Sequence, residues 1–389
     1  MSRSTSNYFW PLNINNFSLL DKLRICSFIL NPKSRWTQDK QVKSFELLFE
    51  RYIGKKFSVF VSSGSTANTI LAMYLRDSNT TKNIVVFPST TWITSVSPFI
   101  REGFTPKFID VSLDDLSMNL DLLEIYLSQF ADKVACVFIT SLLGFTPDID
   151  RLKFIEKTYN VKVMLDNCEN TFGTFNGKNV SKEFTSTTST YFGHQIQSIE
   201  GGFIFTDSEE EYNYFLMARN HGMVRSIQGD NSKYLNPLVD NRFDFNILGN
   251  NFRNTDLNAF IGKLDFKRID SYTNKRLSLY NLYKSNLDKN KFILPKEFDN
   301  RVHVPFSLPI ICKNKVTKAL ILNYCAQKGI ETRPIISGNL LRQTCLKDYS
   351  EYHNYPISEF LNENGLYVGL YSKLSVDMVS NFVENINKL

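Results

Sequence analysis

From Phe57 onward, short apolar runs alternate with longer stretches of helical periodicity. This alternation is typical of βαβ units, in which successive strands lie parallel in one sheet and helices cover its faces. Seven runs have the length and composition of strands: 58–61, 84–87, 107–110, 134–140, 162–165, 186–192 and 202–206. We therefore expect an α/β protein with one large, mainly parallel sheet and with ligands bound beyond the carboxyl ends of its strands.

The pattern changes near Leu264, and a chain of 389 residues is long for a single core. Beyond that point the sequence predicts a smaller α/β unit, with helices at 268–287, 315–328 and 376–388 and an apolar run at 302–311. We divide the chain into an N-terminal arm (1–40), a large domain (41–264) and a small C-terminal domain (265–389). The arm is rich in aromatic residues, and we expect it to pack on the large domain or on a partner.

Composition excludes several classes of protein. Hydrophobic residues make up 42% and charged residues 22% of the chain, as in an ordinary globular protein. The net charge of +6 is spread without a run of five like charges, which is too weak a field to indicate nucleic-acid binding. Six cysteines lie far apart without a CxxC pair, so we expect free thiols and no metal site. The N-terminus lacks a signal-like apolar core and no stretch could span a membrane, which predicts a cytoplasmic protein.

A Gly-Ser-Thr turn follows the first predicted strand, at Gly64, Ser65 and Thr66. Glycine permits a tight turn, and amides and hydroxyls at a helix N-terminus suit a phosphate group. The same residues would also serve as an ordinary helix cap, and the turn alone does not decide between the two interpretations.

Two further groups stand where predicted strands end. Trp92 follows the second strand and could stack on a flat heteroaromatic ring, although a partly buried core tryptophan is the commoner case. Asp166 and Glu169 follow an apolar strand. A carboxylate that leaves such a strand is costly unless it is paired, so we expect Asp166 to bind a cation, for which a protonated pyridine nitrogen is suitable.

The turn between the last two predicted strands carries Ser189, His194 and the run Glu200-Gly201-Gly202. His194 is the residue of this turn whose side chain titrates near neutrality, which suits a proton carrier. A structural histidine that fixes a loop is nonetheless more common than a catalytic one.

Together these motifs resemble the DegT/StrS-type sugar aminotransferases, which use pyridoxal phosphate and act on nucleotide-linked keto-sugars. The resemblance also covers 249–262, which matches G-x-N-x-R-x-[ST]-[DE]-L-x-A, and 331–343 with its Thr-Arg-Pro. It implies the aspartate-aminotransferase-like fold (fold type I) and a homodimer with a shared active site, in which Asn251 reaches the partner's cofactor phosphate. The cofactor-binding residues that it implies are Gly64, Ser65, Trp92, Asp166, Glu169, Ser189 and Asn251.

Substrate contacts are expected at His221, Arg333 and Arg342. His221 matches a family loop near the active site. The two arginines could clamp a diphosphate through bidentate hydrogen bonds, whereas solvated surface arginines are the simpler interpretation. The Thr-Arg-Pro segment resembles the sugar 3-dehydratase branch of the family in particular.

One departure from the family decides the expected reaction: His194 stands where the family has its cofactor-binding lysine. Imidazole can carry a proton but cannot bond covalently to pyridoxal phosphate as a lysine amine does. The resemblance then implies a dehydratase that holds pyridoxamine phosphate non-covalently, uses His194 as catalytic base and removes the C3 hydroxyl of a nucleotide-linked 4-keto-6-deoxy sugar. GDP-4-keto-6-deoxymannose is the expected substrate and L-glutamate the amino donor.

Three alternatives remain open at this point. An iron–sulfur-dependent sugar 3-dehydrase would need a compact cysteine cluster, which this chain lacks. A nucleotide-sugar aminotransferase would need another lysine, and none lies in the turn around His194. A catalytically silent scaffold of the same fold would have no use for Asp166 as a pyridinium partner.

Overall fold

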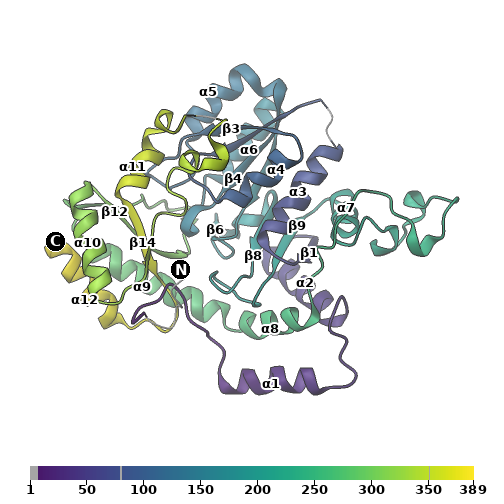
Figure 1. Ribbon diagram of the computed structural model, residues 1–389, viewed down its shortest axis with the longest axis horizontal. Coiled ribbons are helices and arrows are strands. Elements are labelled where there is room, and N and C mark those ends of the chain that lie inside the picture. The colour runs from purple at the N-terminus through teal and green to yellow at the C-terminus, as the bar shows by residue number, and fades with distance from the viewer. Residues whose placement is uncertain (1–7, 79–80, 350) are drawn as a thin grey trace.

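The computed structural model describes residues 8–78, 81–349 and 351–389, and its largest feature is a seven-stranded sheet (Figure 1). The strand order is β1-β9-β8-β5-β4-β2-β3. The strands are β1 (Phe57–Val61), β2 (Ile84–Pro88), β3 (Thr105–Ile109), β4 (Val134–Thr140), β5 (Lys162–Asp166), β8 (Thr185–Ser189) and β9 (Gly202–Thr206). Strand β9 pairs antiparallel with β1 and β8, and the other neighbouring strands of this sheet pair in parallel. The predicted mainly parallel sheet of seven strands is confirmed.

Helices cover both faces of this sheet because successive strand residues point to opposite sides. Val59 and Val61 pack with α3, α4 and α7, whereas Phe60, between them, packs with α2 on the other face. Helices α5 and α6 cover that second face near β4 and β5. The bounds are α2 (Lys40–Ile53), α3 (Gly64–Ser78), α4 (Ser97–Arg101), α5 (Leu120–Phe130), α6 (Ile149–Tyr159) and α7 (Glu209–Arg219). The large unit is therefore a three-layer α/β structure.

The C-terminal part contains a second sheet, which is antiparallel and has the order β10-β12-β14-β13. Its strands are β10 (Phe292–Ile293), β12 (Ser307–Cys312), β13 (Thr332–Arg333) and β14 (Gly365–Gly369). Its helices are α9 (Ile269–Asn286), α10 (Lys315–Gln327), α11 (Pro356–Asn364) and α12 (Val376–Lys388), preceded by α8 (Asp256–Phe266). The predicted helices are confirmed to within one or two residues, while the domain boundary at 264/265 stays a prediction.

Two connections join the parts. A small sheet pairs β11 (Arg301–Val302) with β6 (Thr174–Phe175), and β6 with β7 (Lys178–Asn179). In addition, Leu142, Leu143 and Phe145 of the large unit belong to the hydrophobic core of the C-terminal part. The two parts therefore share buried surface.

The N-terminal arm packs in two places. Helix α1 (Leu19–Leu30) lies on α8, where the rings of Phe28 and Phe260 stack with centroids 4.7 Å apart. Trp10 is 2% exposed, but it is buried in the C-terminal core, where its indole N–H donates to the Gly369 carbonyl at 2.9 Å. The expectation of packing on the large domain therefore holds for α1 and was wrong for Trp10, whose contacts lie far away in the sequence.

All six cysteines are free, and Cys136, Cys312 and Cys325 are buried. In the part of the chain that the structure describes, none of the helices combines the length and the apolar character needed to cross a membrane.

Candidate active site

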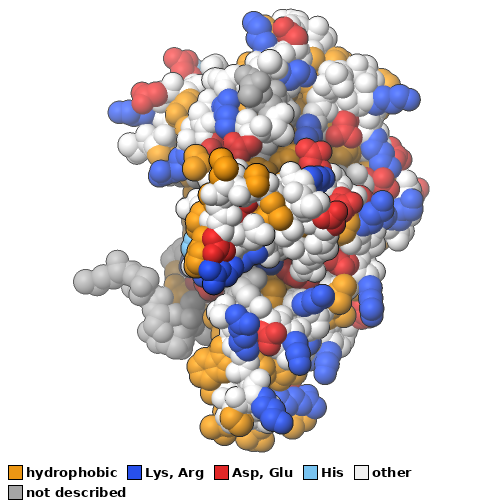
Figure 2. Space-filling view, turned by 90° about the vertical axis from the view of Figure 1, so that its right-hand side faces the viewer, with side chains coloured by type: hydrophobic (Ala, Val, Ile, Leu, Met, Phe, Trp, Pro, Cys, Tyr) orange, Lys and Arg blue, Asp and Glu red, His pale blue; other side chains and the backbone are white. Residues whose placement is uncertain are grey.

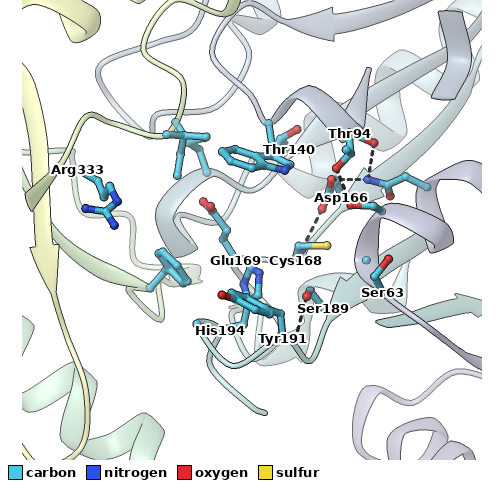
Figure 3. A pocket seen from close by; sticks show the side chains of 18 of the residues that line it. Ser63, Thr94, Thr140, Asp166, Cys168, Glu169, Ser189, Tyr191, His194 and Arg333 are labelled. Atoms are coloured by element: carbon cyan, nitrogen blue, oxygen red, sulfur yellow. Dashed lines mark hydrogen bonds between the residues drawn. The ribbon is translucent and has the colours of Figure 1, made fainter. Parts of the chain in front are cut away.

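A cavity of about 540 Å³ lies at the carboxyl ends of β4, β5 and β8 and is bounded on the other side by the C-terminal part. A volume of this size is typical of sites for small molecules and cofactors. In Figure 3, Asp166 and Arg333 lie on opposite sides of the cavity, with Glu169 and His194 between them. The lining residues include Ser63, Gly64, Ser65, Trp92, Asp166, Cys168, Glu169, Ser189, Tyr191, His194, Glu200, Phe306, Arg333 and Tyr367.

One end of the cavity is formed by the N-terminus of α3 together with Ser189 at the end of β8. Helix α3 begins at Gly64, where an added Cβ would lie 2.7 Å from the Cys168 sulfur and 3.1 Å from the Ser189 Cβ. A Cβ on Gly202 would lie 2.4 Å from the Ser63 carbonyl carbon and oxygen. Both glycines are therefore needed for close approach of the backbone, and the helix N-terminus is left open toward an anion.

Asp166 is the last residue of β5 and is 4% exposed. Its Oδ2 accepts hydrogen bonds from Asn68 Nδ2 at 2.9 Å and Ser95 Oγ at 2.6 Å, and its Oδ1 accepts one from the Cys168 amide at 3.0 Å. All three donors are neutral groups. A buried carboxylate held by neutral donors at a cavity wall is well placed to pair with a cationic ligand atom.

His194 lies in the turn between β8 and β9, and its amide donates to the Tyr191 carbonyl at 2.9 Å. Its ring contacts the Tyr191 ring, with centroids 6.0 Å apart, and the Phe306 ring at 5.4 Å. The residue is half-buried, but its Nδ1 is shielded from solvent and accepts no hydrogen bond from the described residues. Burial lowers the pKa of His194 to about 4, so the imidazole is neutral near pH 7.

Glu169 lies next to His194, between Arg333 and Asp166 (Figure 3). Its Oε2 accepts a hydrogen bond from the Leu143 amide at 2.6 Å. Leu143 has the left-handed backbone angle φ 52°, which is uncommon for a side chain of its type. Burial, with a contribution from nearby Asp166, raises the pKa of Glu169 to about 8, and the carboxyl group is therefore mostly protonated at neutral pH.

Of the other residues that the sequence assigned to the site, Trp92 and Arg333 line the cavity and Arg342 does not. Trp92 lines the cavity and is 54% exposed. Arg333 also lines it, and its guanidinium pairs with Glu331 at 2.7 Å. Arg342 does not reach the cavity, because its guanidinium binds Glu359 and lies 4.5 Å from the centre of the Tyr352 ring.

Asn251 and His221 also do not line the cavity within this chain. Asn251 is exposed, and its Oδ1 accepts a hydrogen bond from Arg253 at 3.0 Å. The His221 amide donates to the Asn250 carbonyl at 2.8 Å, and its φ is 62°. Thr255 caps α8 and accepts from the Asn258 amide at 3.1 Å, so this segment does serve as a helix cap.

Sequence reasoning missed three aromatic residues of the site: Tyr191, Phe306 and Tyr367. Tyr191 lies three residues before His194 and could have been included with that turn. Phe306 directly precedes β12, and Tyr367 lies within β14. Nothing in their local sequence distinguishes them from aromatic residues of the core.

The chemistry of the cavity fits pyridoxal phosphate. Its α3 end offers amides and hydroxyls to a phosphate, and Asp166 offers a buried carboxylate to a pyridine nitrogen. The His194 imidazole lines the same cavity and can carry a proton there. No lysine of the described residues lines the cavity, so a covalently bound cofactor is not expected there.

Comparisons with known proteins agree with this chemistry. Residues 29–387 match the sequence model of the DegT/DnrJ/EryC1/StrS aminotransferase family. The chain is 28% identical over 369 residues to a GDP-4-keto-6-deoxy-D-mannose 3-dehydratase of Yersinia pseudotuberculosis, covering 91% of this chain and 92% of that protein. It is similar to the structure of the Escherichia coli GDP-4-keto-6-deoxy-D-mannose-3-dehydratase with bound hydrated PLP, with a TM-score of 0.88, 26% identity, and coverage of 97% and 99%.

A second solved structure is a GDP-4-keto-6-deoxymannose-3-dehydratase with a trapped PLP-glutamate geminal diamine. Its TM-score is 0.87 and its identity 26%, and the match covers 97% of this chain and all of the other. The predicted fold type I is thus confirmed.

Proposed function

Because the chain belongs to the DegT/DnrJ/EryC1/StrS aminotransferase family, we propose that it is a pyridoxal-phosphate-dependent sugar 3-dehydratase. Its substrate is a nucleotide-linked 4-keto-6-deoxy sugar, GDP-4-keto-6-deoxy-D-mannose, as the name of the Yersinia relative indicates. The observation that carries the proposal is His194: a neutral imidazole, rather than a lysine amine, projects into a cavity whose described lining contains no lysine. Such a site can transfer protons without tethering the cofactor.

Specific residues would hold the cofactor. The α3 N-terminus at Gly64 and Ser65, together with Ser189, would bind the phosphate, and Asp166 would pair with the pyridine nitrogen. Trp92 would lie against the ring, and Glu169 would lie near the ring hydroxyl. In its pyridoxamine form, the bound cofactor supplies an amine and an electron-accepting ring.

The protein's own groups carry the proton chemistry. His194, neutral near pH 7, acts as the base. Glu169, which keeps its proton up to about pH 8, adds no second negative charge beside Asp166 and can donate a hydrogen bond. The rings of Phe306 and Tyr191 lie beside the imidazole, with centroids 5.4 Å and 6.0 Å away. L-glutamate is the proposed amino donor that restores the cofactor amine, which is supported by the PLP-glutamate adduct in the related structure.

Substrate binding and assembly extend the proposal. Arg333, which lines the cavity, is the proposed diphosphate contact, whereas Arg342 is held outside it by Glu359. We further propose a homodimer in which Asn251 and His221 complete the partner's site. In support, the segment 224–250 projects at the right of Figure 1, and the side chains of Leu238 (89%) and Leu248 (93%) are exposed to solvent. Figure 2 views this side of the molecule, where hydrophobic and charged side chains are interspersed. Its location in the cytoplasm stays a prediction.

The test is a product assay. The purified protein is incubated with pyridoxal phosphate, L-glutamate and GDP-4-keto-6-deoxy-D-mannose, and ammonia and the 3-deoxy sugar are measured. Ammonia and 3-deoxy product in equal amounts are expected. An amino sugar as the product would instead identify an aminotransferase, and lack of binding to either cofactor form would identify a silent scaffold.

A further inference from the structure

Residues 10–13 of the N-terminal arm lie against the edge of the C-terminal sheet. The Trp10 amide donates to the Gly329 carbonyl at 3.1 Å, and the Glu331 amide donates to the Trp10 carbonyl at 2.9 Å. The arm then passes over Gly369, where an added Cβ would lie 2.4 Å from the Pro11 carbonyl oxygen. The backbones are therefore in direct contact, and the path of this segment is closely defined.

On one side this segment reaches the arginine of the cavity. The Leu12 amide donates to Glu331 Oε2 at 3.0 Å, and Glu331 is 2% exposed. The other carboxylate oxygen, Oε1, pairs with the Arg333 guanidinium at 2.7 Å. A buried carboxylate with both oxygens engaged has little freedom, so the arm fixes the group that orients Arg333.

On the other side the same segment reaches the turn that carries His194. The Asn13 side-chain amide donates to the Phe192 carbonyl at 2.6 Å, two residues before the histidine. The part of the turn after His194 is held separately, because Gln195 Nε2 donates to the Val304 carbonyl at 2.5 Å. Asn13 thus holds the residues before His194, and Gln195 holds the turn after it.

We propose that residues 10–13 are a positioning element of the active site, in which Asn13 fixes the turn that carries His194 and Leu12 fixes the Arg333 guanidinium through Glu331. This inference rests on the proposed function, in which His194 and Arg333 act on the nucleotide sugar. The segment is therefore part of the catalytic apparatus, although none of its side chains lines the cavity. A misplacement of about 1 Å in a catalytic group can lower a rate by about 100-fold, so one remote hydrogen bond is sufficient for a measurable effect.

The test compares Asn13→Ala with a matched control, Asn15→Ala, in the full-length protein. Asn15 belongs to the same arm and is exposed. Its side-chain oxygen accepts a hydrogen bond from the nearby Phe17 amide at 2.8 Å, so this contact stays within the arm. We expect Asn13→Ala to lower kcat for 3-deoxy sugar formation by about tenfold, with KM and affinity for pyridoxal phosphate within about twofold. Asn15→Ala should match the wild type.

Two further measurements separate the possible failures. Hydrogen–deuterium exchange of the unliganded protein should be faster at residues 192–196 in Asn13→Ala and unchanged in Asn15→Ala, and Glu331→Gln should raise KM for the sugar without lowering kcat. Wild-type exchange in Asn13→Ala would overturn the inference, as would a wild-type kcat. Absence of 3-deoxy product from the wild-type protein would overturn the proposed function instead, and the exchange measurement would still decide the role of Asn13.

Discussion

The two walls of the cavity are built in different ways. The wall formed by the large sheet consists of residues at strand ends and one helix N-terminus, among them Gly64, Asp166 and Ser189. The opposite wall consists of Phe306, Arg333 and Tyr367, which belong to the C-terminal part and lie far apart in the sequence. The first wall is held by the sheet and by hydrogen bonds to Asp166 from Asn68, Ser95 and Cys168, whereas the second depends on packing between the parts and on the arm.

This difference separates two tasks. The sheet wall offers groups suited to a phosphate and a pyridine nitrogen, which are common to every reaction of such a cofactor. The C-terminal wall offers an arginine and aromatic rings, which suit the recognition of a particular substrate. Substitutions in the first wall are therefore expected to change cofactor binding or chemistry, and those in the second to change KM.

His194→Ala should have the largest effect. Removal of a general base lowers kcat by about 10² to 10⁴-fold, and cofactor affinity should change little because the imidazole does not bond to the cofactor. A second variant, His194→Lys, should form a covalent adduct with pyridoxal phosphate that borohydride traps and that the wild type lacks, because a lysine amine can bond to the cofactor. His353→Ala, at an exposed histidine paired with Glu351, serves as the control. A borohydride adduct in the wild type would contradict the proposed role of His194.

Gly64→Ala tests the sheet wall. The added methyl group would lie 2.7 Å from the Cys168 sulfur, and overpacking of this kind costs about 1–3 kcal/mol. We expect affinity for pyridoxal phosphate, measured by absorbance titration, to fall by about 10 to 100-fold. The double variant Gly64→Ala/Cys168→Ala should recover part of the loss, because the sulfur is then absent. Equal affinities in the single variant and the wild type would show that the α3 end does not hold the phosphate.

Arg333→Ala and Arg342→Ala test the C-terminal wall as a pair. Loss of a hydrogen bond to a charged group costs about 1.5–3 kcal/mol, so Arg333→Ala should raise KM for the nucleotide sugar about tenfold or more, with kcat less affected. Arg342 is engaged by Glu359 and the Tyr352 ring, and its removal should change KM by less than about threefold. A larger effect from Arg342→Ala would mean that its loop rearranges when substrate binds.

The smallest effect is expected for pH, because kcat/KM should change little between about pH 5 and pH 7. His194 has a lowered pKa of about 4, so the base is lost only as the pH falls toward 4 rather than 6.5. Glu169 has a raised pKa of about 8, so its proton is lost as the pH rises through 8, and the rate should decline there. Glu169→Gln cannot ionise and should remove this alkaline decline while it changes the rate at pH 7 by less than about threefold. An unchanged decline would assign it to another group.

The sequence predicted the strands of the large sheet and the site residues that stand directly after them. All seven strands of the large sheet were predicted, and Asp166 and Gly64 were assigned to the site because each stands where a predicted strand ends. Strand β8 ends at Ser189 rather than at residue 192, because the chain leaves the sheet there to form the histidine turn. The end of a strand is set by its neighbours in the sheet, which local composition does not encode.

The C-terminal wall could not be predicted in the same way. Phe306 and Tyr367 reach the cavity only because the second sheet packs against the large unit, and the position of Arg342 is decided by Glu359 on α11. Trp10 was expected elsewhere because its partner, Gly369, lies 359 residues away. Such contacts depend on tertiary packing, and their sequence signal is indistinguishable from that of ordinary core residues.

The close approach of Gly202 to the Ser63 carbonyl leaves no space for even one methyl group between β9 and the turn that precedes α3. The α3 end of the cavity therefore has a fixed width at this point, and it cannot be enlarged there by exchanging side chains. A designer who wishes to redirect this enzyme to a bulkier sugar should leave that end untouched and vary Phe306 and Tyr367, together with Ile336, which also lines the cavity.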